Sequence, residues 1–254
     1  MANVYVTLAD LLKINDQNLA DLDVSDLLQD APLLAALVAD VASNGTEHKY
    51  LKETEAPVVG FRAANDGREN KASADTLVTI ALKILDASFA IDMAIADGYQ
   101  KGGAQALIAR EGQRHLRAAF FHAEKQLIEG TGSDAGGFTG LLDASTIDDI
   151  ADAMVVDAGG STANTGSSVI AVRSTMDRND VTLITGNDGD IEMGETVVQR
   201  VSGATGFYPA YFTPITGWLG LQIGSAYSVG RIANLTEDAE EELDEEKLRD
   251  LISK

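Results

Sequence analysis

The sequence contains no cysteine, which excludes disulfide bonds, thiolate metal sites and cysteine nucleophiles. It has only 4 prolines and 1 tryptophan in 254 residues. No stretch approaches the roughly 20 apolar residues that a membrane-spanning helix requires. The N-terminus also lacks a basic segment followed by an apolar core and a cleavage site. We therefore expect a soluble, unsecreted protein that has no contact with a membrane.

Basic residues are scarce, with 19 Lys and Arg against 40 Asp and Glu, and the formal net charge is −21. Tight binding to DNA or RNA depends mostly on cation–phosphate contacts, so this balance is unfavourable for a general nucleic-acid binder. A large negative charge also keeps a protein soluble and opposes premature self-association. The hydrophobic content of 45% is sufficient for one large or two modest domains.

Signatures of catalysis are missing as well. The chain has three histidines, and His115 and His122 are seven positions apart, too far for an i, i+4 pair of metal ligands. There is no serine elbow, dinucleotide fingerprint or histidine–metal motif. Carboxylates are too frequent in this chain to single out a pair. The sequence therefore predicts no active site, no metal and no cofactor, and we expect that the protein is not an enzyme.

One long amphipathic helix is predicted from Ala104 to Glu129. This stretch has no proline, its only glycine is Gly112, and its apolar residues recur at three- and four-residue steps. Such a helix is roughly 40 Å long and suits a structural spine. The glycines that begin at Gly130 should end it. Its polar face carries a positive cluster, Arg110, Arg114 and Arg117. We expect these arginines to pair with acidic groups within or between subunits, with DNA contact as the less favoured alternative.

Residues 1–43 are acidic and amphipathic, and we expect short helices there, one of which begins at Pro32. They pack on the core of the same chain or form an arm that docks on a neighbour.

From residue 47 to 93 the apolar residues repeat every second position, with strand-like runs at 48–63 and 72–92 joined by a turn at Asn65-Asp66-Gly67. This predicted hairpin presents a mixed-sign surface, which suits contact with another subunit or simply faces solvent. Its basic residues are Lys49, Lys52, Arg62, Arg68 and Lys71.

The second half of the chain is predicted to be mainly β. A glycine-rich loop at 130–142 has Phe138 as its single apolar anchor. An amphipathic helix is expected at 147–156. Residues 206–234, which hold most aromatic residues, indicate irregular β structure with closely packed backbone. A helix with Thr236 as its N-cap ends the chain. Strands are expected at 167–174, 180–186 and 195–202.

Four stretches carry a family resemblance. In chain order they read VVGFRAANDGREN, LKILDAS, REGQRHLRAAFFHAEKQ and GWLGLQIGS. In amino-acid sequence and in order along the chain, they resemble the major capsid proteins of tailed bacteriophages. The resemblance covers nearly the whole chain. It implies the Hong Kong 97-like shell fold, an α+β fold also found in encapsulins. The implied parts are an N-arm at 1–43, an extended E-loop hairpin at 44–91, a peripheral domain with the spine helix at 92–142, and an axial domain with strands returning to the periphery at 143–254.

The resemblance also implies a function. The subunits would assemble as hexamers and pentamers into an icosahedral head shell that encloses double-stranded DNA without sequence-specific binding. Scaffolding, portal and decoration proteins would be partners, with assembly in the host cytoplasm and final location in the virion. The eight basic residues of the hairpin and the long helix are the candidate inter-subunit contacts. In the family that the chain resembles, the polypeptide continues beyond the helix that corresponds to Leu243–Lys254. We therefore expect that this chain is either part of a longer polypeptide or a shorter member of the family. An encapsulin-like nanocompartment and an acidic binding module without an assembly role are the alternatives.

Overall fold

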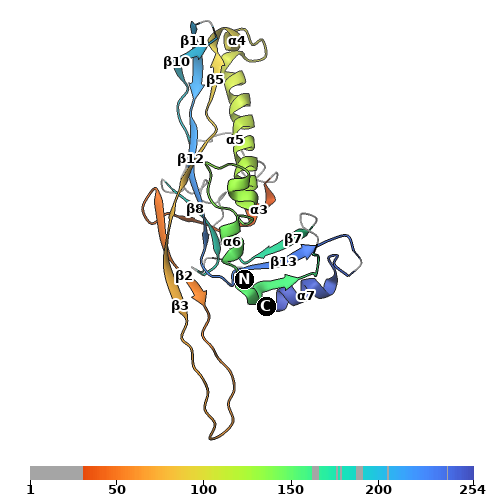
Figure 1. Ribbon diagram of the computed structural model, residues 1–254. Helices are drawn as coiled ribbons and strands as arrows, with labels where there is room; N and C mark the ends of the chain where they lie inside the picture. The colour runs from red at the N-terminus through yellow and green to blue at the C-terminus, as the bar shows by residue number, and fades with distance from the viewer. Residues whose placement is uncertain are drawn as a thin grey trace, which may run out of the picture. The chain divides into compact units, whose positions relative to one another are not determined.

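A computed structural model describes residues 31–161, 166–175, 177, 179–186, 191–204, 206–238 and 240–254. The chain divides into two compact units, and both contain helices and strands (Figure 1). Unit 1 comprises residues 1–48, 80–143 and 183–221. Unit 2 comprises residues 49–79, 144–182 and 222–254. The expected α+β composition is confirmed.

Unit 1 is built on α5 (Gly103–Glu129), the long helix in Figure 1. The sequence predicted this helix to within one residue at its start, and it ends as expected at Gly130, whose φ is 59°. The predicted apolar face is buried, with Leu116, Phe120 and Leu127 among the most deeply buried side chains. The three arginines of the opposite face are exposed. The helix thus separates a packed side from a charged side.

A short helix, α3 (Pro32–Ala36), packs against α5. It begins at Pro32, as predicted. The amides of Leu33 and Leu34 donate to the Glu124 carboxylate of α5, at 2.8 and 3.0 Å. The other helices expected in the N-terminal segment fall on residues 1–30, outside the described residues.

The larger sheet of unit 1 has the strand order β1-β8-β12-β4, with β9 also paired to β12. β1 and β8 are parallel, and Ala39 lies opposite Leu183. Every residue of β8 is buried, including Thr182 and Thr185. The strands are β1 (Ala39–Val41), β4 (Lys83–Asp86), β8 (Val181–Thr185), β9 (Ile191–Met193) and β12 (Ile215–Ile223).

A second sheet of unit 1 has the order β10-β11-β5. Its pairs are antiparallel, and β10 and β11 form a regular ladder from Val197 opposite Phe212 to Gly203 opposite Gly206. The elements are β5 (Phe89–Asp92), α4 (Met93–Asp97), β10 (Val197–Gly203) and β11 (Gly206–Thr213). The expectation of irregular structure at 206–234 is wrong, because three regular strands, β11, β12 and β13 (Val229–Leu235), occupy most of it. A Cβ atom on Gly220 would lie 2.6 Å from Cδ2 of Leu82, so this glycine lets the Leu82 side chain pack directly on the strand backbone.

Unit 2 contains a sheet with the order β6-β13-β7. Ala158, Ile232, Leu235 and Leu251 form its buried cluster, and Leu251 comes from α7. The elements are α6 (Ala144–Asp148), a 3-10 turn (Asp152–Met154), β6 (Val155–Asp157), β7 (Ser167–Val172), β13 (Val229–Leu235) and α7 (Glu245–Ser253).

Two helix predictions in unit 2 are wrong. The helix expected at 147–156 stops at Asp148, because residues 155–157 pair in parallel with β13 and this pairing requires extended backbone. The terminal helix begins after Asp244, whose side chain accepts a hydrogen bond from the Lys247 amide. The hydroxyl of Thr236, the expected N-cap, instead donates to Glu241 at 2.6 Å within a turn.

The predicted hairpin consists of β2 (Glu47–Glu55) and β3 (Ala74–Ala81). Its strands are shorter than expected, and the predicted run at 72–92 is divided among β3, β4 and β5. Between β2 and β3 only an isolated bridge joins Val58 to Lys71. The turn is close to its predicted place, since the Asp66 amide donates to the Ala63 carbonyl and Asn65 has a φ of 63°. We call residues 56–73 the hairpin tip.

Candidate interaction surfaces

The base of the hairpin is fixed within unit 2. Nζ of Lys52 lies 2.7 Å from Oδ2 of Asp149, and Lys52 is only 8% exposed. The Glu53 amide donates to the Gly224 carbonyl at 2.9 Å, and the Ala226 amide donates to the Glu53 carbonyl at 3.0 Å. These contacts hold the point from which the tip extends. They also place Lys52, one of the predicted contact residues, in an ion pair inside its own chain.

The hairpin tip is exposed along almost its whole length and carries an apolar run. Val59 is 87% exposed, Phe61 is fully exposed, and Val58 is also exposed. The guanidinium of Arg62 donates to the Asp66 carbonyl at 3.2 Å, and Lys71 pairs with Glu55 at 2.5 Å. The tip thus presents exposed apolar side chains beside the charged residues that the sequence predicted there.

The arginines on α5 have partners of different kinds. Arg114 lies 2.8 Å from the Glu111 carboxylate, an ion pair within the helix. Arg110 donates to the Tyr99 hydroxyl at 3.4 Å. Arg117 is exposed on the same face. For Arg114, pairing within the chain is confirmed, whereas contact with a second subunit remains a prediction for all three.

The glycine-rich loop that follows α5 is held by two polar residues that sequence reasoning missed. Nε2 of Gln126 donates to the Phe138 carbonyl at 2.7 Å and to the Asp134 carbonyl at 3.2 Å. The Asp143 carboxylate accepts from the Thr131 amide at 3.0 Å and from the Gly140 amide at 2.7 Å. A polar residue on the buried face of a predicted helix was the signal that could have identified Gln126.

Phe138 is buried in this loop, as predicted, but it is not the single apolar anchor. Leu141 is buried too, and its amide donates to the Leu127 carbonyl at 2.9 Å. This hydrogen bond holds the end of the loop against the last turn of α5. The loop is therefore packed against the helix at both of these positions.

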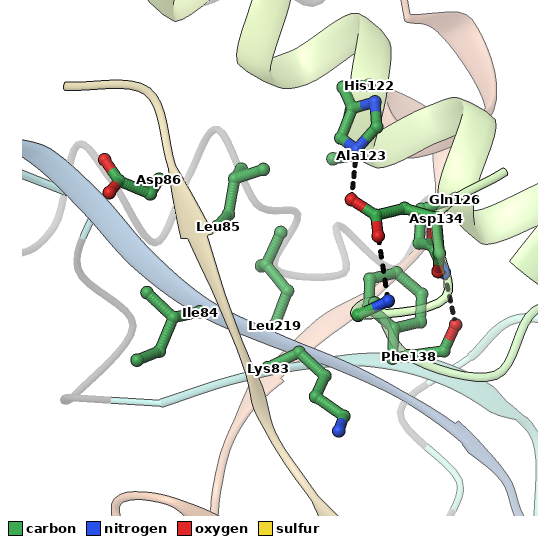
Figure 2. Close-up of a pocket in the computed structure, with 12 residues that line it drawn as sticks. Lys83, Ile84, Leu85, Asp86, His122, Ala123, Gln126, Asp134, Phe138 and Leu219 are labelled. Carbon is green, nitrogen blue, oxygen red and sulfur yellow. Dashed lines mark hydrogen bonds and ion pairs between the residues drawn. The ribbon is translucent and has the colours of Figure 1, made fainter. Parts of the chain in front are cut away.

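Gln126 and Phe138 line a pocket of about 270 Å³ in unit 1. Figure 2 shows the His122 ring above Asp134, at a distance of 3.6 Å, and the residues of β4 and β12 on the opposite side. Among the buried side-chain nitrogen and oxygen atoms of the described residues, Oε1 of Gln126 alone has no hydrogen-bond partner. The remaining lining residues that Figure 2 labels are Lys83, Ile84, Leu85, Asp86, Ala123 and Leu219.

A second pocket of unit 1, of about 510 Å³, lies between β5, α4, α5 and β11. We call it the α5 pocket. It is mostly apolar and also contains two carboxylates, Asp92 and Glu111. His115 lines it, and its ring stacks on Phe89 with centroids 4.8 Å apart. The other apolar lining residues are Ala90, Ile91, Ile95, Leu107 and Tyr208.

The histidines of α5 take part in packing and hydrogen bonding. Nδ1 of His115 lies 3.1 Å from the Ala87 carbonyl oxygen. The residues that the structure describes contain no group of three or more side chains suited to hold a metal ion. Within the same residues, no helix is long and apolar enough to cross a membrane.

Solved structures with a similar chain fold define the class of this protein. A chain of bacteriophage Epsilon15 matches with a TM-score of 0.58 at 17% identity, over 86% of this chain and 68% of that one. The SrpI encapsulin of Synechococcus elongatus PCC 7942 matches with a TM-score of 0.52 at 11% identity, over 80% and 87% of the two chains. The fold is therefore the Hong Kong 97-like fold of viral and encapsulin shells.

The family model described as major capsid protein GP7 matches residues 16–254. The chain belongs to this family of major capsid proteins. No curated protein sequence matches it significantly. Membership makes it a structural shell protein of the phage particle, which acts as one of many copies. The resemblance seen in the sequence is thus confirmed for fold and function.

Proposed function

We propose that this major capsid protein self-assembles as hexamers and pentamers into an icosahedral head shell around double-stranded DNA. The hairpin tip is the observation that supports this role best. Its base is hydrogen-bonded within unit 2, whereas Val59 and Phe61 at the tip are exposed to solvent. An exposed apolar run gains free energy when a partner covers it, and a shell supplies many identical partners.

The parts of the chain take different roles in this proposal. Residues 1–43 form the N-arm, 44–91 the E-loop hairpin, 92–142 the peripheral domain and 143–254 the axial domain with returning strands. The hairpin would lie over an adjacent subunit. Most of the proposed inter-subunit cations are exposed and Arg68 is half-buried, whereas Lys52 is secondary because Asp149 already pairs with it. The others are Lys49, Arg62, Arg68, Lys71, Arg110, Arg114 and Arg117.

In this proposal, the negative charge of the protein determines how the shell interacts with the enclosed DNA. With a net charge of −21, the shell repels packed DNA and encloses it without sequence-specific binding. Scaffolding, portal and decoration proteins would guide assembly in the host cytoplasm before the head becomes part of the virion. The chain itself would catalyse no reaction.

Assembly can be tested with a variant that lacks the tip. Residues 57–72 are replaced by Asn-Gly, which closes a two-residue hairpin. The purified chain is examined by electron microscopy with and without a candidate scaffolding protein. We expect uniform icosahedral shells from the unaltered chain and none from the variant, while circular dichroism and urea unfolding show that the variant subunit is folded. Normal shells from the folded variant would refute the role of the tip, and no shells from either chain would refute self-assembly.

The encapsulin-like alternative is supported by the match to the SrpI encapsulin over 87% of that chain. The two functions differ in what the particle encloses. Shells isolated from an infected host should contain double-stranded DNA protected from nuclease. A co-purified protein cargo without DNA would favour a nanocompartment.

A further inference from the structure

We propose that Asn44 is a site of spontaneous deamidation, in which the backbone amide of Gly45 attacks the Asn44 side chain. Asn44-Gly45 is the only Asn-Gly pair in the sequence. Gly45 and Thr46 form a tight turn between the bridged residues Asn44 and Glu47, at the start of β2. The inference concerns the chemistry of a single subunit, so it does not depend on shell assembly.

The turn leaves the reacting groups open. Asn44 and Gly45 are both exposed, and nothing lies within 4 Å of the place that a Cβ atom on Gly45 would take. The Gly45 φ of 44° is a conformation that glycine adopts readily. Among the described residues, none accepts a hydrogen bond from the Gly45 amide or restrains the Asn44 side chain. The amide nitrogen is therefore free to attack, and water can reach the site.

Hydrogen bonds in the turn also stabilise the nucleophile. The carbonyl oxygen of Asn44 accepts from the Thr46 amide, and from the Glu47 amide at 2.8 Å. When the Gly45 amide loses its proton, its negative charge is shared with this oxygen, because the peptide group is conjugated. Hydrogen bonds to the charged form of a group favour that form. The turn thus lowers the cost of forming the anion that attacks.

The reaction needs only water. The deprotonated Gly45 nitrogen forms a bond to Cγ of Asn44, and the bond between Cγ and Nδ2 breaks. The leaving nitrogen takes a proton from water and departs as ammonia, which leaves a succinimide ring. Water then opens one of the two C–N bonds of the ring. One opening gives aspartate, and the other gives isoaspartate, whose backbone runs through the former side chain.

Two Asp-Gly pairs on helices and turns lack these features. The Gly67 amide already donates to the Asp66 carboxylate at 2.9 Å, and the Gly98 amide donates to the Ala94 carbonyl at 3.3 Å. Their side chains, Asp66 and Asp97, also carry a carboxylate, which is a poorer electrophile than an amide. Asn44 is therefore the position that we expect to react first.

Isoaspartate at this position would disturb the packing of unit 1. The Thr46 carbonyl accepts from the Leu82 amide at 2.9 Å. The Gly45 carbonyl lies so close to Gly186 that a Cβ atom on Gly186 would overlap it. An extra backbone atom between Asn44 and Gly45 displaces both carbonyls. The modification should therefore loosen the turn from which β2 begins.

The site can be tested on the purified, unassembled subunit. The chain is incubated at mildly alkaline pH and mapped by mass spectrometry, and isoaspartate is labelled with an isoaspartate-specific methyltransferase. We expect the peptide that contains Asn44 to gain about 1 Da and to accept the label. The control Asn44→Gln keeps the amide but moves it one methylene away from the Gly45 nitrogen, and it should remain unmodified. An unchanged mass at Asn44, or an equal gain in Asn44→Gln, would overturn the site.

Two further measurements test the turn and the consequence. Conversion of Asn44 should be no slower in the folded subunit than in the urea-unfolded chain, where the hydrogen bonds of the turn are lost; slower conversion would overturn the role of the turn. The isoaspartate form, separated by its added charge, should have a urea midpoint about 0.3–0.7 M lower than the unmodified subunit. Asn44→Asp adds the same charge without lengthening the backbone and should lose less. Equal midpoints for the isoaspartate form and Asn44→Asp would overturn the structural consequence.

Discussion

Replacement of Asp143 by alanine should destabilise the loop that follows α5. The carboxylate accepts hydrogen bonds from the Thr131 amide, the Gly140 amide and the Thr131 hydroxyl. Burial opposes ionisation of this group, but the hydrogen bonds from Thr131 and Gly140 outweigh burial and lower the pKa of Asp143 below its ordinary value. The ionised carboxylate is thus the form that fastens the loop.

The expected loss follows from these contacts. A hydrogen bond to a charged group contributes about 1.5–3 kcal/mol, and the three bonds share one partly exposed acceptor, so we expect about 2–3 kcal/mol for Asp143→Ala. Asp143→Asn keeps one acceptor oxygen and should cost about 1–2 kcal/mol. With a urea dependence of about 3 kcal/mol per molar, a loss of 2 kcal/mol lowers the unfolding midpoint by about 0.7 M.

The assay is urea unfolding of the unassembled subunit, followed by circular dichroism and by the fluorescence of Trp218, the one tryptophan. The exposed Asp148 provides the control Asp148→Asn, which should leave the midpoint unchanged. Because the folded-state pKa of Asp143 is lowered, its contribution is complete above its unfolded pKa of about 3.9 and is lost as the pH falls through the folded-state value. A midpoint for Asp143→Ala equal to that of the unaltered chain, or a difference that grows as the pH falls below about 4, would refute this reasoning.

Two further substitutions test the other polar contacts. Glu124→Gln should cost about 1 kcal/mol and speed amide hydrogen exchange in α3, because the Glu124 carboxylate accepts from Leu33 and Leu34 at the helix start; unchanged exchange would contradict the capping role. Lys52→Met should cost less than about 1 kcal/mol, because the Asp149 side chain is 65% exposed and water can replace its partner. A urea midpoint lower by more than about 0.5 M would show that the ion pair contributes more than we expect.

The sequence predicted best those elements whose signal is local. The apolar residues of α5 recur at three- and four-residue steps between Ile108 and Leu127, so the helix and most of its buried face could be predicted. β6 could not, because only three residues form it and their extended conformation depends on pairing with β13, far along the chain. In residues 206–234 glycine and proline suggested irregularity. The structure uses Gly220 to bring a strand close to Leu82, which no local pattern reveals.

The interaction surfaces also include some features that the local sequence predicts and others that it does not. Exposure of Arg110, Arg114 and Arg117 follows from helix geometry alone. The α5 pocket does not, because its lining comes from segments that are distant in sequence. Asp143 is equally difficult to predict, since its partner Thr131 is 12 residues away across a loop whose conformation the sequence leaves open.

The pairing of β1 with β8 can form only after most of the subunit has been synthesised. The Thr185 hydroxyl donates to the Asp40 carbonyl at 3.1 Å across a separation of 145 residues. At about 5–20 residues per second, the ribosome needs roughly 7–30 s to make the intervening chain. During this interval β1 lacks its partner strand, and its unpaired backbone groups are open to wrong pairing with other nascent chains. β1, the first strand in the described part of unit 1, must therefore wait for a late part of the chain before its backbone groups are paired.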